Sequence, residues 1–194
     1  MANAINFPAA ILQPPFFDPQ APDAVNYGAI GATIGHEISH SFDDEGSQFD
    51  SQGRLRNWWT PEDSAHFKAA TSALVAQYSA YRPFPDLAVN GQQTLSENLA
   101  DLAGLGAAHD AYRASLQGKP PTEDADRQFF TAFARNWCRK AREASLRQQI
   151  IGDGHAPSKY RTFTVRNIDA WYDAFDVQPG QAMYLAPQDR VRVW

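Results

Sequence analysis

The stretch YGAIGATIGHEISHSF, from Tyr27 to Phe42, decides the fold of this chain. Isoleucines recur along it at positions 30, 34 and 38, the four-residue step at which side chains share one face of a helix. The spacing predicts an amphipathic helix of about four turns, with this apolar stripe facing the core. Three glycines interrupt the stretch and lower its helix propensity, so we expect the helix to pack closely against another backbone.

Residues 36 to 40 of this helix read His-Glu-Ile-Ser-His, the H-E-x-x-H pattern. Side chains four residues apart leave a helix on the same face one turn apart, so His36 and His40 can ligate one zinc ion. Glu37 lies next to that face, where its carboxylate can reach a metal-bound water without becoming a ligand. A chance match to so short a pattern is the competing explanation, and a third ligand is needed to decide between the two.

A pair of carboxylates further along the chain offers that ligand. Glu97 and Asp101 are also four residues apart, at the start of a helix that we predict over residues 94–115. Catalytic zinc commonly has two histidines and one glutamate as ligands, and a nearby aspartate can accept a hydrogen bond from the outer N–H of a ligating histidine. Glu97 also fits a capping box that begins at Thr94, but capping does not explain Asp101.

The remaining sequence predicts one mainly helical domain without repeats or linkers. Five prolines keep the first 25 residues out of regular helix, and residues 43–53 read as a polar loop. Further helices are predicted at 60–81, 123–140, 142–151 and 168–175, with a short strand at 160–165.

The composition excludes several classes of protein. The chain has 194 residues, 43% of them hydrophobic, and a net charge of −5 from 17 basic and 22 acidic side chains. This balance argues against intrinsic disorder and against binding to nucleic acid or to an anionic membrane. No apolar run reaches the ~18 residues of a membrane span, no signal peptide is recognisable, and the single cysteine, Cys138, can form no internal disulfide.

Several stretches together resemble the C-terminal catalytic part of the neprilysin and endothelin-converting-enzyme family of zinc metallopeptidases. They are FPAAILQPPFF (7–17), IGHEISHSFDD (34–44), NWWT (57–60), LSENLAD (95–101), WC (137–138), DGHAP (153–157) and VRVW (191–194), the last with valine in place of a usual cysteine. The resemblance implies a mainly α fold with a few short strands, the helical part of a thermolysin-like (gluzincin) metallopeptidase catalytic domain, over residues 1–194.

The resemblance also implies roles for the residues of the two motifs. The ligands of one zinc ion per chain would be His36, His40 and Glu97. The general base would be Glu37, and Asp101 would be the partner of the first histidine.

Other residues acquire roles only through the resemblance. Asp43 would orient His40, although a turn role explains an acid there equally well. His155 would donate to the oxyanion of the tetrahedral intermediate and Asp153 would orient it. Arg161 would hold a substrate carbonyl, where the sequence alone favours a solvated surface arginine. The pocket for the side chain after the scissile bond would be lined by Ile11, Phe16 and Trp137, which on composition alone are ordinary core residues.

The function implied is that of a zinc-dependent endopeptidase acting on small peptides, with no nucleic-acid partner and no membrane segment in this chain. Family members are several times longer, and the part that precedes this chain holds a closing lobe and an Asn-Ala strand that pairs with substrate. Asn3-Ala4 looks like that dipeptide, but its distance from Phe7 aligns it with a later asparagine. We therefore expect a fragment that lacks the lobe and the substrate strand.

Two rival interpretations remain. In one, the chain is a catalytically inactive zinc-binding helical module that self-associates through the surface left by the missing lobe. In the other, an unrelated fold carries an accidental H-E-x-x-H, which leaves Glu97, Asp101 and His155 unexplained. The absence of paired cysteines favours a bacterial parent, in the cell envelope or periplasm or in the cytoplasm, with the compartment undetermined.

Overall fold

The computed structural model describes residues 4–193. Asn3 and Trp194, both part of the stretches considered above, lie outside the described residues. The described part is built from α1 (Asp23–Asn26), α2 (Ala32–Ser39), α3 (Pro61–Ser79), α4 (Leu95–Ser115), α5 (Ala125–Asn136), α6 (Glu143–Gly152), α7 (Ser158–Arg161) and α8 (Asp169–Phe175). A π-helical turn at Tyr27–Gly31 joins α1 to α2, and short 3-10 segments lie at Ala9–Ile11, Gly46–Gln48, Thr162–Asn167 and Pro187–Asp189. The mainly α fold class is confirmed, and no described helix is long and apolar enough to cross a membrane.

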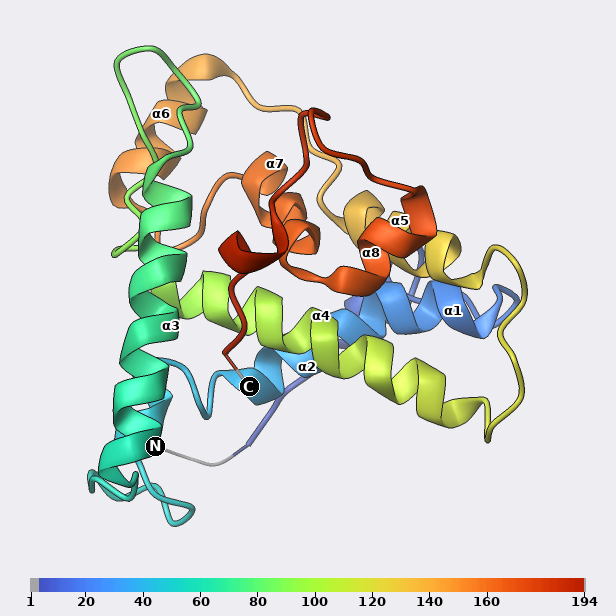
Figure 1. Cartoon of the computed structure of the whole chain (residues 1–194), viewed down its shortest axis with the longest axis horizontal. Coiled ribbons are helices and arrows are strands. Elements are labelled where there is room, and N and C mark those ends of the chain that lie inside the picture. The colour runs from blue at the N-terminus through green and yellow to red at the C-terminus, as the bar shows by residue number, and fades with distance from the viewer. Residues whose placement is uncertain (1–3, 194) are drawn as a thin grey trace.

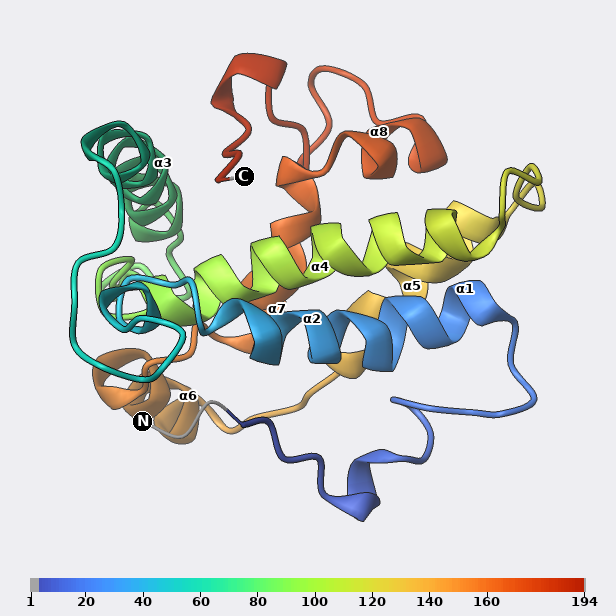
Figure 2. The same cartoon turned by 90° about the horizontal axis from the view of Figure 1, so that it is seen from below.

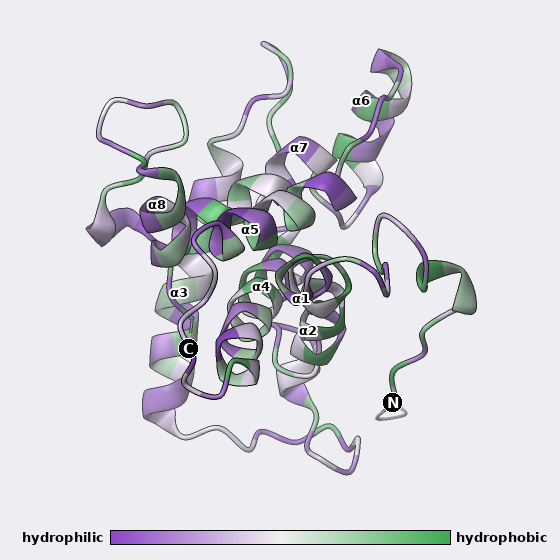
Figure 3. Cartoon of the chain, turned by 90° about the vertical axis from the view of Figure 1, so that its right-hand side faces the viewer, coloured by the Kyte–Doolittle hydropathy of each residue, from purple (hydrophilic) through white to green (hydrophobic). Residues whose placement is uncertain are grey.

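Helices α2 and α4 form the centre of the molecule. They run side by side in opposite directions, with α5 against the α1 end of the pair (Figures 1 and 2). Figure 3 views this group nearly end-on. Helix α3 stands at the other end, and the C-terminal segment of the chain, from α7 (Ser158–Arg161) onward, covers the opposite side of α4.

Two clusters of buried side chains flank α4. One joins its first half to α3 and the C-terminal segment, and it includes Leu74, Tyr78, Leu99, Tyr160 and Val193. The other joins its second half to α1 and α5, and it includes Ala24, Leu105, Tyr112, Phe129 and Phe133. Because α4 contributes to both clusters, it fixes α2 and the C-terminal segment relative to each other.

The close packing predicted from the glycines of α2 occurs against α4. A Cβ on Gly35 would lie 2.6 Å from the carbonyl oxygen of Gly104, and a Cβ on Gly104 would lie 2.3 Å from the backbone nitrogen of His36. Both distances are too short for carbon, so the two backbones approach as closely as glycine alone permits.

Substituting Gly104 with alanine should therefore lower the free energy of unfolding by about 1–3 kcal/mol, because the added methyl group forces α2 away from α4. Gly106, two residues along the same helix, is the matched control, since a Cβ there would meet nothing within 4 Å. Gly106→Ala should stabilise the protein by about 1 kcal/mol through helix propensity alone. Urea denaturation measures both, and equal effects of the two substitutions would contradict the close contact.

The predicted orientation of the isoleucine stripe is wrong beyond its first member. Ile30 is buried, but Ile34 and Ile38 are 38% and 48% exposed. The buried face carries Ala32 and His36 instead, since the short distance to α4 leaves room for small residues and no room for isoleucine. The π turn also shifts the helical phase between Ile30 and the residues after it, so the three isoleucines do not share one face.

The other elements match the sequence to different degrees. Helix α3 begins as predicted, with a capping box in which Thr60 and Asp63 bond reciprocally. The predicted helix at 123–140 is shorter and ends at Asn136. The strand predicted at 160–165 is wrong: this segment lies in α7 and the 3-10 helix after it, and its buried members fall at helical spacing. In the described residues, β pairing is limited to isolated bridges of Phe49 with Leu55 and of Phe84 with Leu87.

Candidate metal centre

Helices α2 and α4 bring His36, His40 and Glu97 together. One nitrogen or oxygen atom from each of the three side chains lies within 4.8 Å of the others. The Nε2 atoms of the two histidines are 3.1 Å apart, and the Glu97 oxygens lie 3.2 Å from Nε2 of His36 and 3.6 Å from Nε2 of His40. The capping box considered for Glu97 does not form, because the Thr94 hydroxyl donates to the carbonyl of Asn90 instead.

The outer nitrogen of each histidine binds an aspartate. Nδ1 of His36 lies 2.9 Å from Asp101, and Nδ1 of His40 lies 2.7 Å from Asp43. Each carboxylate can only accept, so each Nδ1 carries a proton, and Nε2 is the ring atom that each histidine can offer to a metal ion. The two Nε2 atoms lie within hydrogen-bond distance of each other, so a proton on one of them joins the pair until a metal ion displaces it.

Glu97 tests whether these residues fit a metal ion. Its Oε2 atom is buried and accepts no hydrogen bond, although Nε2 of His155, Nε2 of His36 and Nη2 of Arg161 lie 3.1, 3.2 and 3.5 Å away. A carboxylate oxygen without a hydrogen bond and two imidazole nitrogens that lie close together are the donor set of a catalytic zinc site with an open fourth position. The residues fit zinc.

The same carboxylates control protonation of the histidines. Burial opposes a charge on His36, but Asp101 and Glu97 outweigh it and raise the pKa of His36 to about 9. The hydrogen bond to Asp43 raises the pKa of His40 against a smaller effect of burial. Metal binding must displace these protons, so the affinity for zinc should fall as the pH falls.

Arg161 lies in the site as a buried residue and not on the surface. The residue is 7% exposed. Its Nε and Nη2 atoms each donate to one oxygen of Asp101 at 2.7 Å. The guanidinium also lies 3.9 Å from the ring centre of Trp137 and 3.5 Å from Glu97. Burial alone would raise the pKa of Asp101, but Arg161 and His36 hold it below its ordinary value, so Asp101 stays ionised between them.

His155 approaches the centre from the loop that follows α6. Its Nδ1 and its backbone N–H both bind Oδ1 of Asp153, at 2.8 and 2.9 Å. Its Nε2 faces Glu97, and its side chain is about half exposed. The pairing of Asp153 with His155 is thus present, and it leaves one edge of the ring directed at the metal ligands.

The remaining predicted residues lie around this group. Glu37 is exposed on α2 between the two histidines, and its carboxylate forms no hydrogen bond or ion pair within residues 4–193. Trp137 contacts Arg161, as described above. Ile11 and Phe16 are half-buried on the N-terminal segment, which is joined to the π turn by the hydrogen bond from the Ile30 amide to the Phe16 carbonyl at 3.0 Å.

One contact of the site was not predicted. The hydroxyl of Ser96 donates to Asp44 at 2.7 Å and joins the first turn of α4 to the loop after α2. Its two residues are 52 positions apart and neither belongs to a ligand pattern, so the sequence carries no signal for it.

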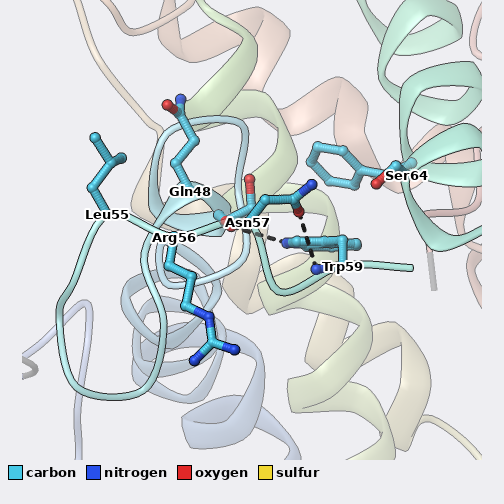
Figure 4. A pocket seen from close by; sticks show the side chains of 8 residues that line it. Gln48, Leu55, Arg56, Asn57, Trp59 and Ser64 are labelled. Atoms are coloured by element: carbon cyan, nitrogen blue, oxygen red, sulfur yellow. Dashed lines mark hydrogen bonds between the residues drawn. The ribbon is translucent and has the colours of Figure 1, made fainter. Parts of the chain in front are cut away.

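A hollow of about 480 Å³ lies apart from the metal centre, at the start of α3 (Figure 4). Its lining comprises Ser47, Gln48, Leu55, Arg56, Asn57, Trp59, Ser64 and Phe67, none of which is a predicted site residue. The indole N–H of Trp59 donates to the Ser47 carbonyl, and the Ser47 amide donates to the carbonyl of Asp43. These two hydrogen bonds of residues that line the hollow tie the loop that carries Asp43 to the segment before α3.

Comparison with known proteins places this geometry in context. A model of peptidase family M13 matches residues 1–191. The chain is 42% identical to neutral endopeptidase of Lactobacillus helveticus over 193 residues, which are 99% of this chain and 29% of that protein. It is 44% identical to neprilysin-11 of Caenorhabditis elegans over 183 residues, 89% of this chain and 22% of that protein.

Solved structures give the same result. The crystal structure of the Mycobacterium tuberculosis zinc metalloprotease Zmp1 with an inhibitor superposes with a TM-score of 0.92 at 48% identity, over 96% of this chain and 30% of Zmp1. PepO of Lactobacillus rhamnosis superposes with a TM-score of 0.86 at 44% identity, over 95% of this chain and 29% of PepO. The chain thus spans less than a third of the length of these relatives.

Proposed function

Because the chain belongs to peptidase family M13, whose members named above include metalloproteases, we propose that it carries the zinc site of an endopeptidase that hydrolyses small peptides. The observation that supports this most directly is the convergence of His36, His40 and Glu97, whose Oε2 atom accepts no hydrogen bond. In this proposal, residues 1–194 are the C-terminal part of the catalytic domain, and the closing lobe and the substrate strand belong to the remainder of the protein; it is supported by the chain spanning less than a third of the length of its relatives.

The chemistry divides among the residues of the site. Zinc, when bound by the two histidines and Glu97, polarises the scissile carbonyl and acidifies the attacking water. Glu37 takes a proton from that water and passes it to the leaving amine; its exposed carboxylate, free of other bonds in the described chain, suits this exchange. Asp101 and Asp43 hold the ligand imidazoles in the tautomer that leaves Nε2 unprotonated.

Two side chains act on the substrate. His155 is oriented by the bond between its Nδ1 and Asp153, and its Nε2 edge is the one that faces the developing oxyanion as a donor. Arg161 is held by two bonds to Asp101, and its Nη1 donors bind neither Asp101 nor Glu97, so they are available for a backbone carbonyl of the peptide. Ile11, Phe16 and Trp137 line the pocket for the side chain after the scissile bond.

The first test is the zinc content of the purified protein by elemental analysis. The wild type should hold a single zinc ion per chain, and His36→Ala should hold none, because it removes one of three ligands. His66→Ala is the control, since His66 bonds the Val193 carbonyl far along the chain and faces no metal ligand. No zinc in the wild type would mean that the ligands do not hold metal in this chain by itself.

A second candidate function is a catalytically inactive zinc-binding module that self-associates. It is supported by four large apolar side chains that are exposed, Ile34, Ile38, Phe42 and Trp58. The rings of Phe42 and Trp58 contact each other, with centroids 6.4 Å apart. In light scattering after size-exclusion chromatography, this function requires a mass that rises with concentration. A monomer at every concentration would reject it.

The relatives bear on the source organism of the chain but not on its cell compartment. Relatives of the chain occur in bacteria, and the single unpaired cysteine agrees with a bacterial source. We propose a bacterial enzyme of the cell envelope, periplasm or cytoplasm, with small peptides as its partners and no nucleic acid.

A further inference from the structure

The loop that carries His155 is packed on one side and held by polar contacts on the other: Ala156 and Pro157, which follow His155, are buried, whereas the helix before it is not. Helix α6 precedes this loop and lies beyond the end of α3, outside the α2–α4 centre (Figure 1). Of its ten residues, Ile150 is the buried one. A helix with so little buried surface gains little stability from packing, so other interactions must fix its position and that of Asp153, on the N-terminal side of the loop.

Two side chains from the segment before α4 supply these interactions. Asp86 forms a two-bond ion pair with the half-buried Arg147 of α6, at 2.8 and 3.1 Å, and the Arg147 guanidinium also lies over the Phe84 ring. Gln93 donates its side-chain amide to the carbonyl of Asp153 at 2.8 Å and to the carbonyl of Ile151 at 3.4 Å. Arg147 therefore fixes the middle of α6, and Gln93 holds its C-terminal end and the first residue of the loop.

Gln93 is suited to this contact by its position and its chemistry. The last carbonyls of a helix lack partners within the helix, and Ile151 belongs to the last turn of α6. A carboxamide supplies the two N–H donors that such carbonyls need, whereas a carboxylate supplies none. Gln93 also stands two residues before α4, which carries Glu97 on its first turn.

We propose that Gln93 is a positioning residue for His155. The buried Ala156 fixes the chain after His155, and Gln93 fixes the chain before it by tying the Asp153 carbonyl to the start of α4; together they set the distance between Nε2 of His155 and Oε2 of Glu97, which is 3.1 Å. The metal ligand and the oxyanion donor are thereby held on one rigid unit, although 58 residues of chain separate them. This inference rests on the proposed function for the role of His155, but the contact itself does not.

The test compares Gln93→Glu with Gln92→Glu. Both substitutions add one negative charge at neighbouring exposed positions, but only the first replaces donors that bind the α6 carbonyls; the side chain of Gln92 forms no hydrogen bond within the described residues. Gln93→Ala serves as a second variant that removes the donors without adding charge. All three should match the wild type in urea midpoint, as exposed substitutions usually do.

Two measurements on the chain itself need no turnover. In hydrogen exchange followed by mass spectrometry, peptides from residues 143–155 should exchange about tenfold faster in both Gln93 variants, while peptides of α4 keep their rates. In spectra of protein labelled with ¹³C at histidine Cε1, the signal of His155, assigned through His155→Gln, should shift or broaden while the other histidine signals stay in place. Gln92→Glu should change neither measurement.

A third measurement addresses catalysis. With zinc bound and a small peptide as substrate, the Gln93 variants should lower kcat about tenfold and leave KM within about twofold, because the oxyanion donor is misplaced and peptide binding is not. Unchanged exchange and an unchanged His155 signal would overturn the proposal, as would a normal kcat in a variant whose loop exchanges faster. A wild type without turnover would count against the proposed function alone, since the exchange and the His155 signal still decide the contact.

Discussion

Replacing Glu37 by glutamine should lower peptide hydrolysis by about 10³-fold while zinc content and stability stay unchanged. The amide has the shape of the carboxylate but cannot accept the proton of the attacking water, and loss of a general base costs on the order of 10²–10⁴ in rate. Glu37 is exposed and bonded to no described residue, so the substitution breaks no contact. The measurement is turnover of a fluorogenic peptide by the zinc-loaded protein, with bound zinc determined on the same sample.

Glu45→Gln is the control for this experiment. Glu45 is also exposed and lies in the loop after α2, so its substitution changes the net charge near the centre by the same amount. It should retain wild-type turnover. If Glu37→Gln keeps more than a tenth of the activity, Glu37 is not the base, and if zinc is lost as well, the fall in rate says nothing about proton transfer.

Asp101→Ala should cost about 3–5 kcal/mol of folding free energy, the largest effect on stability that we expect from a single substitution in this chain. It removes two hydrogen bonds from the buried Arg161 and one from His36, and it leaves the guanidinium charged with no full partner. Zinc affinity should fall by at least 10–100-fold, because His36 is no longer held in its ligating orientation. Urea denaturation and zinc titration measure the two effects.

A second His–Asp–Arg group at the surface provides the control. Asp126 binds His109 at 2.9 Å and Arg113 at 3.4 Å, but it is partly exposed and far from the metal ligands. Asp126→Ala should cost about 1 kcal/mol or less, because water replaces the lost partners. Similar losses of folding free energy for Asp101→Ala and Asp126→Ala would show that burial does not determine how much the contacts of Asp101 stabilise the protein.

The pH dependence of the Asp101 contribution follows from the sign of its shift. Its pKa is lowered despite burial, chiefly by Arg161, so the folded state binds fewer protons than the unfolded state in acid. The stability that Asp101 provides is therefore fully present above the ordinary aspartate pKa and is lost as the pH falls through the lower folded value.

The metal centre was predictable because its information is local. His36 and His40, and likewise Glu97 and Asp101, are four residues apart on a helix, so sequence spacing fixes their relative geometry whatever surrounds them. The burial of Arg161 was not predictable, since it depends on a partner 60 residues away. Gln93 carries even less signal, because its partners are backbone carbonyls that any residue would supply.

The errors in the fold have the same origin. The period of the isoleucines correctly predicts a helix, but the choice of buried face depends on how closely α4 approaches, and the glycines that allow this approach lie on both helices. The segment 160–165 has the aromatic and β-branched composition of a strand, and contacts with the core made by α7 and the following 3-10 helix override that local preference.

The π turn at Tyr27–Gly31 has a consequence for how related sequences are aligned. It holds one residue more than an α-helical turn, and each residue of an α-helix advances by about 100° around the axis. A relative with a single-residue gap at this turn can close it to a regular α turn, which keeps α1 docked on α5 and His36 and His40 facing Glu97 and Asp101. The π turn is therefore the place in this helix where related sequences can differ in length by one residue and still assemble the centre, whereas a gap within the H-E-x-x-H pattern would rotate one histidine away from the other.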